Sequence, residues 1–378
     1  MTHRALELEW GTPGPGARIG GKYVVEGPCG RSDLAAVLSA LRAGLDYRVA
    51  IKVLLPEWAA QPAIRERFLY AARTSARLKG EHVARVLEVG TLEGGAPYLV
   101  VEYMDGQDLA QVLANWGPLP VPTAVDWMLQ AIEAIGEAHA QGIIHRGLKP
   151  PNLFLIRRPD GGECLKVADF GLTAAVDRRL HEWNRSMMLR PDVMQSGGYM
   201  APEQLRDGAT TDARADIWAV GVLLHELVAG ELPFRGRTAP ELCTAVFTQP
   251  PTRITSVRPE APAALEQAIL CCLEKDPDAR FQSVSDLAEA LAPFGTAAAV
   301  ASCERVARVP RAPSALADAP RVSPLPQEDL TSASWPGDAI DEASARRVRG
   351  SPASARIVIG SFLMLAGFGI GVFLFMYA

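Results

Sequence analysis

Three short stretches of the sequence carry the side chains that could do chemistry. Residues 143–152 read Ile-Ile-His-Arg-Gly-Leu-Lys-Pro-Pro-Asn, with Val49-Ala50-Ile51-Lys52 before them and Asp169-Phe170-Gly171 after them. Together they offer imidazole, guanidinium, ammonium, amide and carboxylate groups. In the middle of the first stretch stands Gly147, which has no side chain and can neither accept a proton nor orient a reacting group.

These motifs are followed by others in an order typical of protein kinases. The later ones are Ala201-Pro202-Glu203, Asp216 in Asp-Ile-Trp-Ala-Val-Gly, and Arg280 in Asp-Pro-Asp-Ala-Arg-Phe. Over about residues 23 to 294 the chain resembles the eukaryotic-like Ser/Thr protein kinases found in bacteria. The resemblance implies an α+β fold with a small β-rich lobe and a larger helical lobe. It also implies ATP and Mg²⁺ as cofactors of a phosphoryl transfer to protein Ser/Thr.

The resemblance gives roles to particular residues. It implies that Lys52 holds the α- and β-phosphates of ATP and that Lys149 contacts the γ-phosphate. Asp169 and Asn152 match the two magnesium ligands. The aspartate that accepts the substrate hydroxyl proton in the family is replaced by Gly147, so the catalytic base is missing.

An adenine pocket is implied by position as well. Val101 corresponds to the gatekeeper, and the backbone of Glu102 and of Met104 would meet adenine. Val37, Ala50 and Phe154 would form the apolar walls of this pocket. Gly30 would be the retained glycine of the nucleotide loop. The wall residues would be core residues in most folds, so alone they say little.

Two further motifs imply structural anchors of the helical lobe. By resemblance, Arg280 pairs with Glu203, and Asp216 steadies the backbone of the catalytic loop. Arg146 is retained, so a phosphorylated activation segment could dock on it. Ser196 stands where the family typically has a threonine.

The nucleotide loop departs from the family pattern. A Gly-x-Gly-x-x-Gly-x-Val motif counted back from Val37 gives Gly30, Ser32 and Ala35, so one of three glycines remains. Those glycines let the backbone close over phosphates without side-chain obstruction. Asp33 adds a negative charge near the phosphate position. We therefore expect weakened nucleotide binding.

The helix after Lys52 has also lost an expected acid. Ala71 stands where the family places the glutamate that pairs with the strand lysine. Glu66 is five positions earlier, about 140° around a helix, and faces elsewhere. We therefore predict that Lys52 pairs with Asp169 instead.

Hydrophobic periodicity predicts the elements that must position these residues. Strands are expected over 23–25, 49–55, 86–89 and 98–103, and helices over 121–141, 216–227, 263–274 and 283–291. Strands first and helices later favour a sheet-rich lobe followed by a helical one. The predicted organisation is an N-terminal extension (1–22), a kinase-like domain (23–294), a disordered Ala/Pro/Ser-rich linker (295–356) and a transmembrane helix (357–378).

The final segment predicts a membrane anchor. Residues 357–378 contain no charged side chain, and as a helix they would span about 33 Å, close to the ~30 Å hydrocarbon core of a bilayer. A buried core helix is the alternative, which uniform apolarity and the preceding linker disfavour. Arginines between residues 346 and 356 predict a tail anchor with the folded region in the cytoplasm. Gly367 and Gly371 could support a homodimer.

Composition narrows the function classes. A net charge of −5 and the lack of a long basic run argue against a nucleic-acid partner. Six scattered cysteines are typical of reduced thiols in the cytoplasm, and residues 1–17 lack the apolar core of a signal peptide.

Two functions remain open. We favour a pseudokinase that regulates or scaffolds cytoplasmic proteins with weak or residual Mg·ATP binding. The alternative is a slow Ser/Thr kinase that uses its retained residues for positioning. A ligand-sensing receptor is disfavoured, because no segment is expected outside the membrane.

Overall fold

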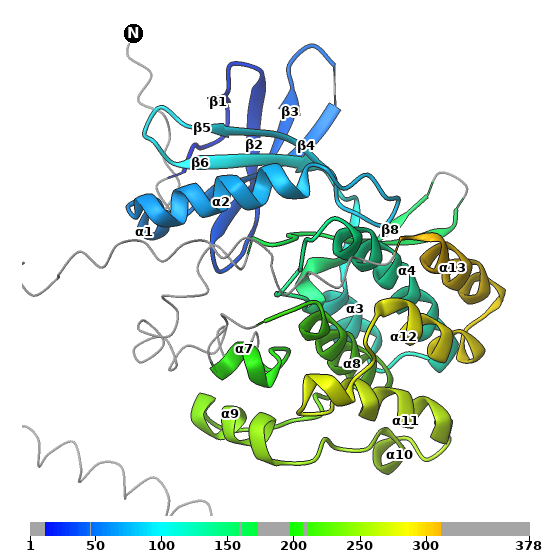
Figure 1. Ribbon diagram of the computed structural model, residues 1–378. Helices are drawn as coiled ribbons and strands as arrows, with labels where there is room; N and C mark the ends of the chain where they lie inside the picture. Colours follow the sequence, from blue (N-terminus) through cyan, green and yellow to red (C-terminus); the bar gives the residue numbers. More distant parts are fainter. Residues whose placement is uncertain (1–11, 46, 159–160, 173–196, 207–210, 311–378) are drawn as a thin grey trace, which may run out of the picture. The chain divides into compact units, whose positions relative to one another are not determined.

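The computed structural model describes residues 12–45, 47–158, 161–172, 197–206 and 211–310, all within one compact unit (Figure 1). A sheet-rich lobe comes first and a helical lobe follows, as the order of predicted elements indicated. The predicted transmembrane helix, Ser196, Gly367 and Gly371 lie outside the described residues. Within the described residues, no helix is long and apolar enough to cross a membrane.

The first lobe is built on a six-stranded sheet in the order β1-β2-β3-β4-β6-β5. The strands are β1 Arg18–Ile19, β2 Tyr23–Arg31, β3 Ala35–Arg42, β4 Tyr47–Leu54, β5 Val86–Thr91 and β6 Pro97–Glu102. Helix α1 (Pro56–Ala59) precedes α2 (Pro62–Ser75), which lies along β5 and β6 in Figure 1. The sheet therefore has one face covered by a helix.

Strand β4 shows how alternation divides this lobe into two cores. Ala50 and Leu54 belong to the apolar cluster that includes Phe68 of α2, whereas Ile51 and Val53 belong to a cluster on the opposite face. A period of two sends successive side chains to opposite faces of a sheet. Lys52 shares the α2 face with Ala50 and Leu54, which directs its ammonium group toward α2.

The second lobe is mostly helical. Its helices are α3 Leu109–Trp116, α4 Val121–Ala140, α7 Pro202–Arg206, α8 Arg214–Ala229, α9 Ala239–Thr248, α10 Ile254–Val257, α11 Ala263–Cys272, α12 Val284–Leu291 and α13 Ala297–Arg308. Short 3-10 turns are η1 Pro150–Asn152, η3 Pro277–Ala279 and η4 Ala292–Phe294. A three-stranded sheet, β7 Gly106–Asp108, β8 Leu153–Arg157 and β9 Glu163–Val167, completes the lobe.

Helix α8 is the centre of this lobe. It is apolar on nearly all sides, and Trp218, Leu223 and Leu224 are fully buried. A helix that is hydrophobic all round belongs in a core. Gly221 permits the approach of α11, because a Cβ atom there would lie 2.5 Å from the Cβ of Cys272.

The predicted elements agree with the structure in type. The strands expected at 23–25, 49–55, 86–89 and 98–103 correspond to β2, β4, β5 and β6. The four predicted helices correspond to α4, α8, α11 and α12, with ends shifted by no more than a few residues. Such shifts are usual, because helix ends fray and periodicity marks them poorly.

The prediction that a disordered linker begins at residue 295 is wrong for its first part. Helix α13 packs against α4 through a stripe of small residues, Ala299, Ser302 and Val306, all buried. Its start is fixed by Thr296, whose backbone N–H and hydroxyl donate to Asp126 at 2.9 and 2.7 Å. The Ala-rich composition suggested too little apolar surface, but small side chains bury enough by letting two helices approach closely.

An ion pair strengthens the contact between α13 and α4. Arg305 of α13 donates to both carboxylate oxygens of Glu133 on α4, at 2.7 and 2.8 Å. A two-bond guanidinium–carboxylate contact fixes orientation better than a single bond does. The folded region therefore extends through residue 308.

The docking of α13 can be tested with a matched pair of valines. Val306 is 2% exposed and Val300, on the same helix, is 53% exposed. In a chain ending at residue 310, we expect Val306→Ala to lower the free energy of unfolding by about 2 kcal/mol, because buried methyl groups are lost and a cavity remains. Val300→Ala should change it by no more than about 0.5 kcal/mol. Equal effects in urea unfolding would contradict a docked α13.

Candidate functional site

The backbone of the catalytic loop is held by one buried carboxylate. Asp216, near the start of α8, accepts hydrogen bonds from the backbone N–H of His145 at 2.9 Å and of Arg146 at 2.8 Å. Its second oxygen also lies 2.8 Å from Nε2 of His139. Burial would raise the pKa of this carboxyl, but these hydrogen bonds outweigh burial and lower it. The predicted role of Asp216 is confirmed.

Two residues of the site adopt backbone conformations that are rare for non-glycine residues. Arg146 has φ of 62° and Asp169 has φ of 68°. Such left-handed conformations are costly for non-glycine residues, so they persist only where surrounding contacts hold the backbone in place. For Arg146 these surroundings are Asp216 on its N–H and Gln204, whose amide donates to its carbonyl at 2.9 Å.

His145 is held as a neutral ring between two backbone groups. Its Nε2 donates to the carbonyl of Ala168 at 2.8 Å, and its Nδ1 accepts from the N–H of Gly147 at 3.2 Å. The ring is fully buried and tilted against Phe170, with centroids 4.8 Å apart. Burial lowers the pKa of His145, in agreement with this tautomer. His145 thus ties the catalytic loop to the segment that carries Asp169.

Gly147 lies where the catalytic base was expected, in a backbone that is otherwise well supported. Its N–H donates to His145, and its carbonyl accepts from the amide of Asn152 at 2.8 Å. Asn152 is buried, and its own carbonyl accepts from the N–H of Ala168 at 2.9 Å. The loop therefore keeps its framework and lacks only the side chain.

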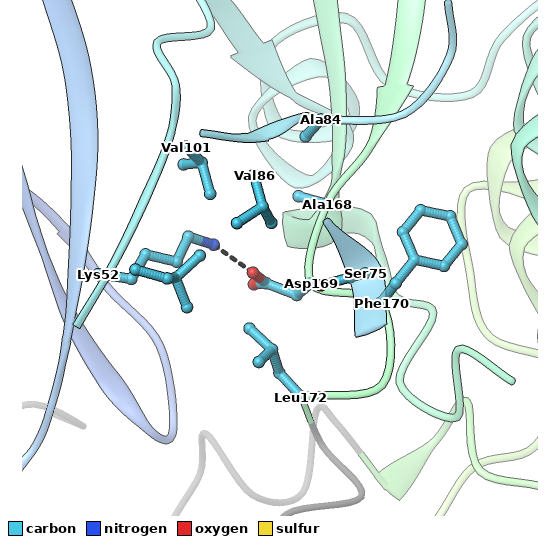
Figure 2. Close-up of a pocket in the computed structure, with 10 residues that line it drawn as sticks. Lys52, Ser75, Ala84, Val86, Val101, Ala168, Asp169, Phe170 and Leu172 are labelled. Carbon is cyan, nitrogen blue, oxygen red and sulfur yellow. Dashed lines mark hydrogen bonds and ion pairs between the residues drawn. The ribbon is translucent and has the colours of Figure 1, made fainter. Parts of the chain in front are cut away.

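The predicted pairing of Lys52 with Asp169 is confirmed. Nζ of Lys52 lies 2.5 Å from Oδ1 of Asp169, and the two side chains are 9% and 13% exposed. Figure 2 shows them facing each other across the pocket. Ala71 of α2 offers no carboxylate, and Glu66 is exposed at the surface. Lys52 is therefore paired with a residue that resemblance assigns to the metal.

A pocket surrounds this ion pair. Val101 and Val86 lie on one side of the pair and Leu172 on the other (Figure 2). The remaining lining residues are Ser75, Ala84, Leu99, Ala168 and Phe170. Most of these side chains are apolar, so the ion pair lies among low-polarity neighbours.

Cross-strand register brings part of the predicted adenine pocket together. Val37 pairs with Lys52, and Ala50 pairs with Val101. Residues directly opposite on neighbouring strands share one face. Gly30 pairs with Val37, which places the retained loop glycine beside the same strands.

Among the described residues, Lys52 and Val101 are the predicted nucleotide-pocket residues that line this cavity, and its lining does not include Gly30, Val37, Ala50, Glu102, Met104 or Phe154. Phe154 lies on β8 opposite Lys166 and is half-buried. Met104 follows the end of β6 and is also half-buried. The carboxylate of Glu102 accepts from Lys166 at 2.9 Å, so the side chain of Glu102 ties β6 to β9.

Lys149 has a partner that the sequence did not identify. Its Nζ lies 2.8 Å from Oδ2 of Asp33, in the turn between β2 and β3. The sequence showed a negative charge in this turn but not its direction. The structure therefore joins the nucleotide loop directly to the catalytic loop.

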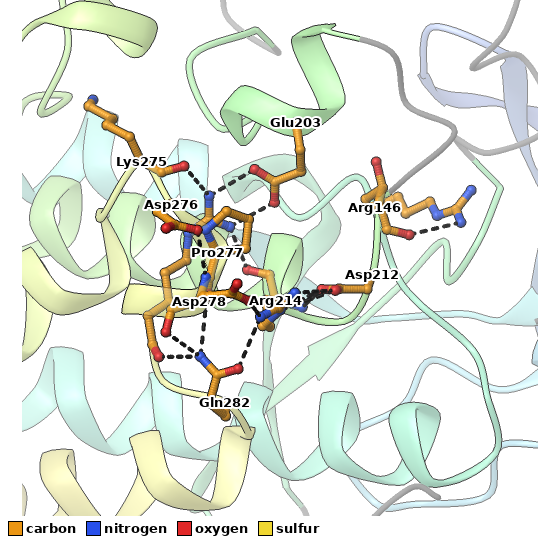
Figure 3. Close-up of polar contacts among 11 residues, drawn as sticks. Arg146, Glu203, Asp212, Arg214, Lys275, Asp276, Pro277, Asp278 and Gln282 are labelled. Carbon is orange, nitrogen blue, oxygen red and sulfur yellow. Dashed lines mark hydrogen bonds and ion pairs between the residues drawn. The ribbon is translucent and has the colours of Figure 1, made fainter. Parts of the chain in front are cut away.

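The second predicted anchor is confirmed as well. Arg280 donates to both oxygens of Glu203 at 2.7 and 2.8 Å and lies 5.1 Å from the centroid of the Trp218 ring. Figure 3 shows the surrounding network, in which Arg214 contacts Asp212 and Asp278 at 2.7 and 2.6 Å. These contacts fix α7, α8 and η3 relative to one another.

The neutral state of His145 has a consequence for stability. Its pKa is lowered in the folded chain, so the unfolded chain binds more protons once the pH falls below about 6.5. We expect the free energy of unfolding to fall with pH below that value, by at most about 1.4 kcal/mol per pH unit from this group. His145→Gln should flatten the slope in urea titrations between about pH 7.5 and pH 5.5. An unchanged slope would contradict a neutral His145 in the folded chain.

Comparisons with known proteins agree with this geometry. A family model described as the protein kinase domain matches residues 23–291. The chain is 33% identical over 341 residues to serine/threonine-protein kinase pkn3 of Myxococcus xanthus, covering 89% of this chain and 61% of that protein. It is also 33% identical to Pkn1 of the same organism, covering 69% of this chain and 36% of that protein. The chain thus spans less than two thirds of these relatives.

A solved structure gives the same result. The kinase domain of Mycobacterium tuberculosis PknI superposes with a TM-score of 0.59 and 27% identity, covering 75% of this chain and 100% of that one. Both lobes have the expected character, one β-rich and one helical. The chain therefore belongs to the protein kinase domain family, and its folded region is a Ser/Thr protein kinase domain homologous to those of bacterial kinases.

Proposed function

We propose that the protein is a membrane-anchored cytoplasmic signalling module, a pseudokinase that regulates or scaffolds partner proteins and binds Mg·ATP weakly. The observation that carries this proposal is the well-supported backbone at Gly147. Asp216, His145 and Asn152 hold the loop in place, yet residue 147 itself carries no carboxylate. The hydrogen bonds that hold this loop stabilise the fold, but without a base the loop cannot accept the proton of a substrate hydroxyl.

The loss of the base supports the proposal that catalysis is strongly impaired. Loss of a general base costs about 10²- to 10⁴-fold, equivalent to about 3–5 kcal/mol of transition-state stabilisation. The lysine that would hold phosphates is bonded to Asp169 and would have to exchange that partner. With Ala71 in place of an acid, α2 supplies no carboxylate to reposition Lys52. These losses need not add, because the residues work as a unit.

The residues present fit a magnesium–nucleotide complex in their donor chemistry. A carboxylate oxygen of Asp169 and the amide oxygen of Asn152 are ligands that Mg²⁺ accepts, with phosphates and water completing the shell. Bound there, the metal would supply charge neutralisation for the phosphates. The chain's own part is to hold Asn152 through Gly147 and Asp169 through its left-handed backbone.

A slow Ser/Thr kinase is the second candidate. What favours it is the retention of Lys52, Lys149, Asn152 and Asp169 within one site. Positioning and charge stabilisation supply most of the catalysis in phosphoryl transfer, so a site without a base need not be silent. The two candidates differ in whether transfer is measurable at all.

Membrane attachment is part of the proposal. Residues 357–378 would span the bilayer, and the arginines that precede them would stay on the cytoplasmic side. Gly367 and Gly371 would allow two such helices to pack closely. Partners in the cytoplasm would then be gathered at the membrane surface by the kinase domain.

Phosphoryl transfer from radiolabelled ATP, with Mg²⁺ and with Mn²⁺, separates the two candidates. We expect the full-length chain to label itself and a Ser/Thr-rich protein no more than Asp169→Ala does. Transfer that disappears with Asp169→Ala would defeat the pseudokinase proposal. A rise in melting temperature with ATP, lost in Asp169→Ala, would support residual nucleotide binding.

Restoring the missing acids tests which loss matters more. We expect Gly147→Asp alone to recover less transfer than the pair Gly147→Asp/Ala71→Glu, because both the base and the acid that positions Lys52 are missing. Ala71→Gln in the pair is the matched control, with similar size and no charge. Full recovery by Gly147→Asp alone would show that the base is the main deficit.

The membrane anchor is tested by cell fractionation. We expect the full-length chain to remain in the membrane fraction after alkaline extraction, and a chain ending at residue 356 to leave it. Replacing residues 357–378 by an unrelated apolar helix should restore attachment. Recovery of the full-length chain in the extract would contradict the anchor.

A further inference from the structure

A salt bridge spans the site at the point where the terminal phosphate of a nucleotide would lie. It joins Nζ of Lys149, in the catalytic loop, to Oδ2 of Asp33, in the nucleotide loop, at 2.8 Å. The lysine side chain is 18% exposed and the aspartate side chain is 49% exposed. By family resemblance, Lys149 is the residue that contacts the γ-phosphate. The carboxylate of Asp33 therefore binds the same ammonium group that the γ-phosphate would bind.

The turn that carries Asp33 is fixed from outside the site. Its carbonyl accepts a hydrogen bond from the indole N–H of Trp58 at 3.0 Å, and Trp58 is 3% exposed. At the preceding residue, the N–H of Ser32 donates to the carbonyl of Ala35 at 2.8 Å, and the Ser32 hydroxyl oxygen accepts from the N–H of Ala35 at 3.1 Å. The carboxylate of Asp33 thus extends from a backbone tied to α1.

The charges of the site are balanced by the chain itself. Lys52 is paired with Asp169, and Lys149 is paired with Asp33. The two lysines that resemblance assigns to the phosphates are therefore each paired with a carboxylate. The net charge of these four side chains is zero. An incoming γ-phosphate would have to displace Asp33, whereas a nucleotide that ends at the β-phosphate would not.

We propose that Asp33 occupies the terminal-phosphate position and determines which nucleotide this site accepts. The site takes adenosine or adenosine diphosphate in preference to adenosine triphosphate. This inference rests on the nucleotide binding that is part of the proposed function, and it gives a physical cause for weak ATP binding. An internal carboxylate competes with the γ-phosphate for one lysine.

The size of the effect follows from electrostatics. A half-exposed ion pair contributes little to folding, so removal of Asp33 should leave the fold intact. Removing the negative charge that lies beside Lys149 in the nucleotide loop should strengthen ATP binding about tenfold. Adenosine has no phosphate and should not respond.

The experiment measures the binding of adenosine, Mg·ADP and Mg·ATP to the full-length chain by calorimetry. We expect the unaltered chain to bind ADP at least as tightly as ATP. Asp33→Asn should tighten ATP binding about tenfold, ADP binding by less than about threefold, and adenosine binding not at all. Asp33→Glu, which keeps the charge, should keep the preference for ADP.

Glu57 provides a matched control. Glu57 is an exposed acid on α1, and its carboxylate lies 3.8 Å from the guanidinium group of Arg31. Arg31 stands two residues before Asp33 in the sequence. Glu57→Gln removes the same charge without touching the contact with Lys149. If Asp33→Asn and Glu57→Gln tighten ATP binding equally, the effect is one of general charge and the proposal is overturned.

The remaining outcomes separate this inference from the proposed function. An unaltered chain that prefers ATP, with no change in Asp33→Asn, overturns the inference and leaves weak ATP binding standing. Binding of ATP by Asp33→Asn alone supports the inference and contradicts residual binding in the native chain. If neither binds any of the three ligands, nucleotide binding is refuted, and with it the selection of a nucleotide by Asp33.

Discussion

The carboxylate of Asp216 is the contact on which the rest of the site depends. It is buried at the start of α8, itself the most enclosed helix of its lobe, and it binds two successive backbone N–H groups of the catalytic loop. Because the loop is fixed there, His145 reaches Ala168 and Asn152 reaches Gly147. A single buried charge with satisfied hydrogen bonds thus transmits the rigidity of the core to the loop.

This rigid framework stands beside two departures from the family pattern. The base is absent at Gly147, and Lys52 is bonded to Asp169 rather than to an acid of α2. The structural anchors, Arg280 with Glu203 and Asp216 with the loop, remain. The residues that hold the fold are therefore different from those that resemblance assigns to the reaction. A binding module is the use that we propose for such a site.

Some contacts of the site could be predicted from the sequence and others could not, and the reasons are physical. Arg280 and Glu203 could be paired because each belongs to a fixed motif, and Lys52 could be paired with Asp169 because Ala71 left no other acid in place. The contact of Lys149 with Asp33 bridges residues far apart in the chain, and no periodicity encodes it. Helix α13 was missed because its buried stripe consists of small residues, whose low hydrophobicity hides a close helix contact.

We propose that the domain holds a kinase framework without kinase chemistry. The most direct test is the intact mass of the purified full-length chain after prolonged incubation with ATP, Mg²⁺ and Mn²⁺, beside Asp169→Ala treated in the same way. We expect both chains to keep the mass of the unmodified protein. Phosphorylated species that accumulate in the native chain and are absent from Asp169→Ala would contradict it.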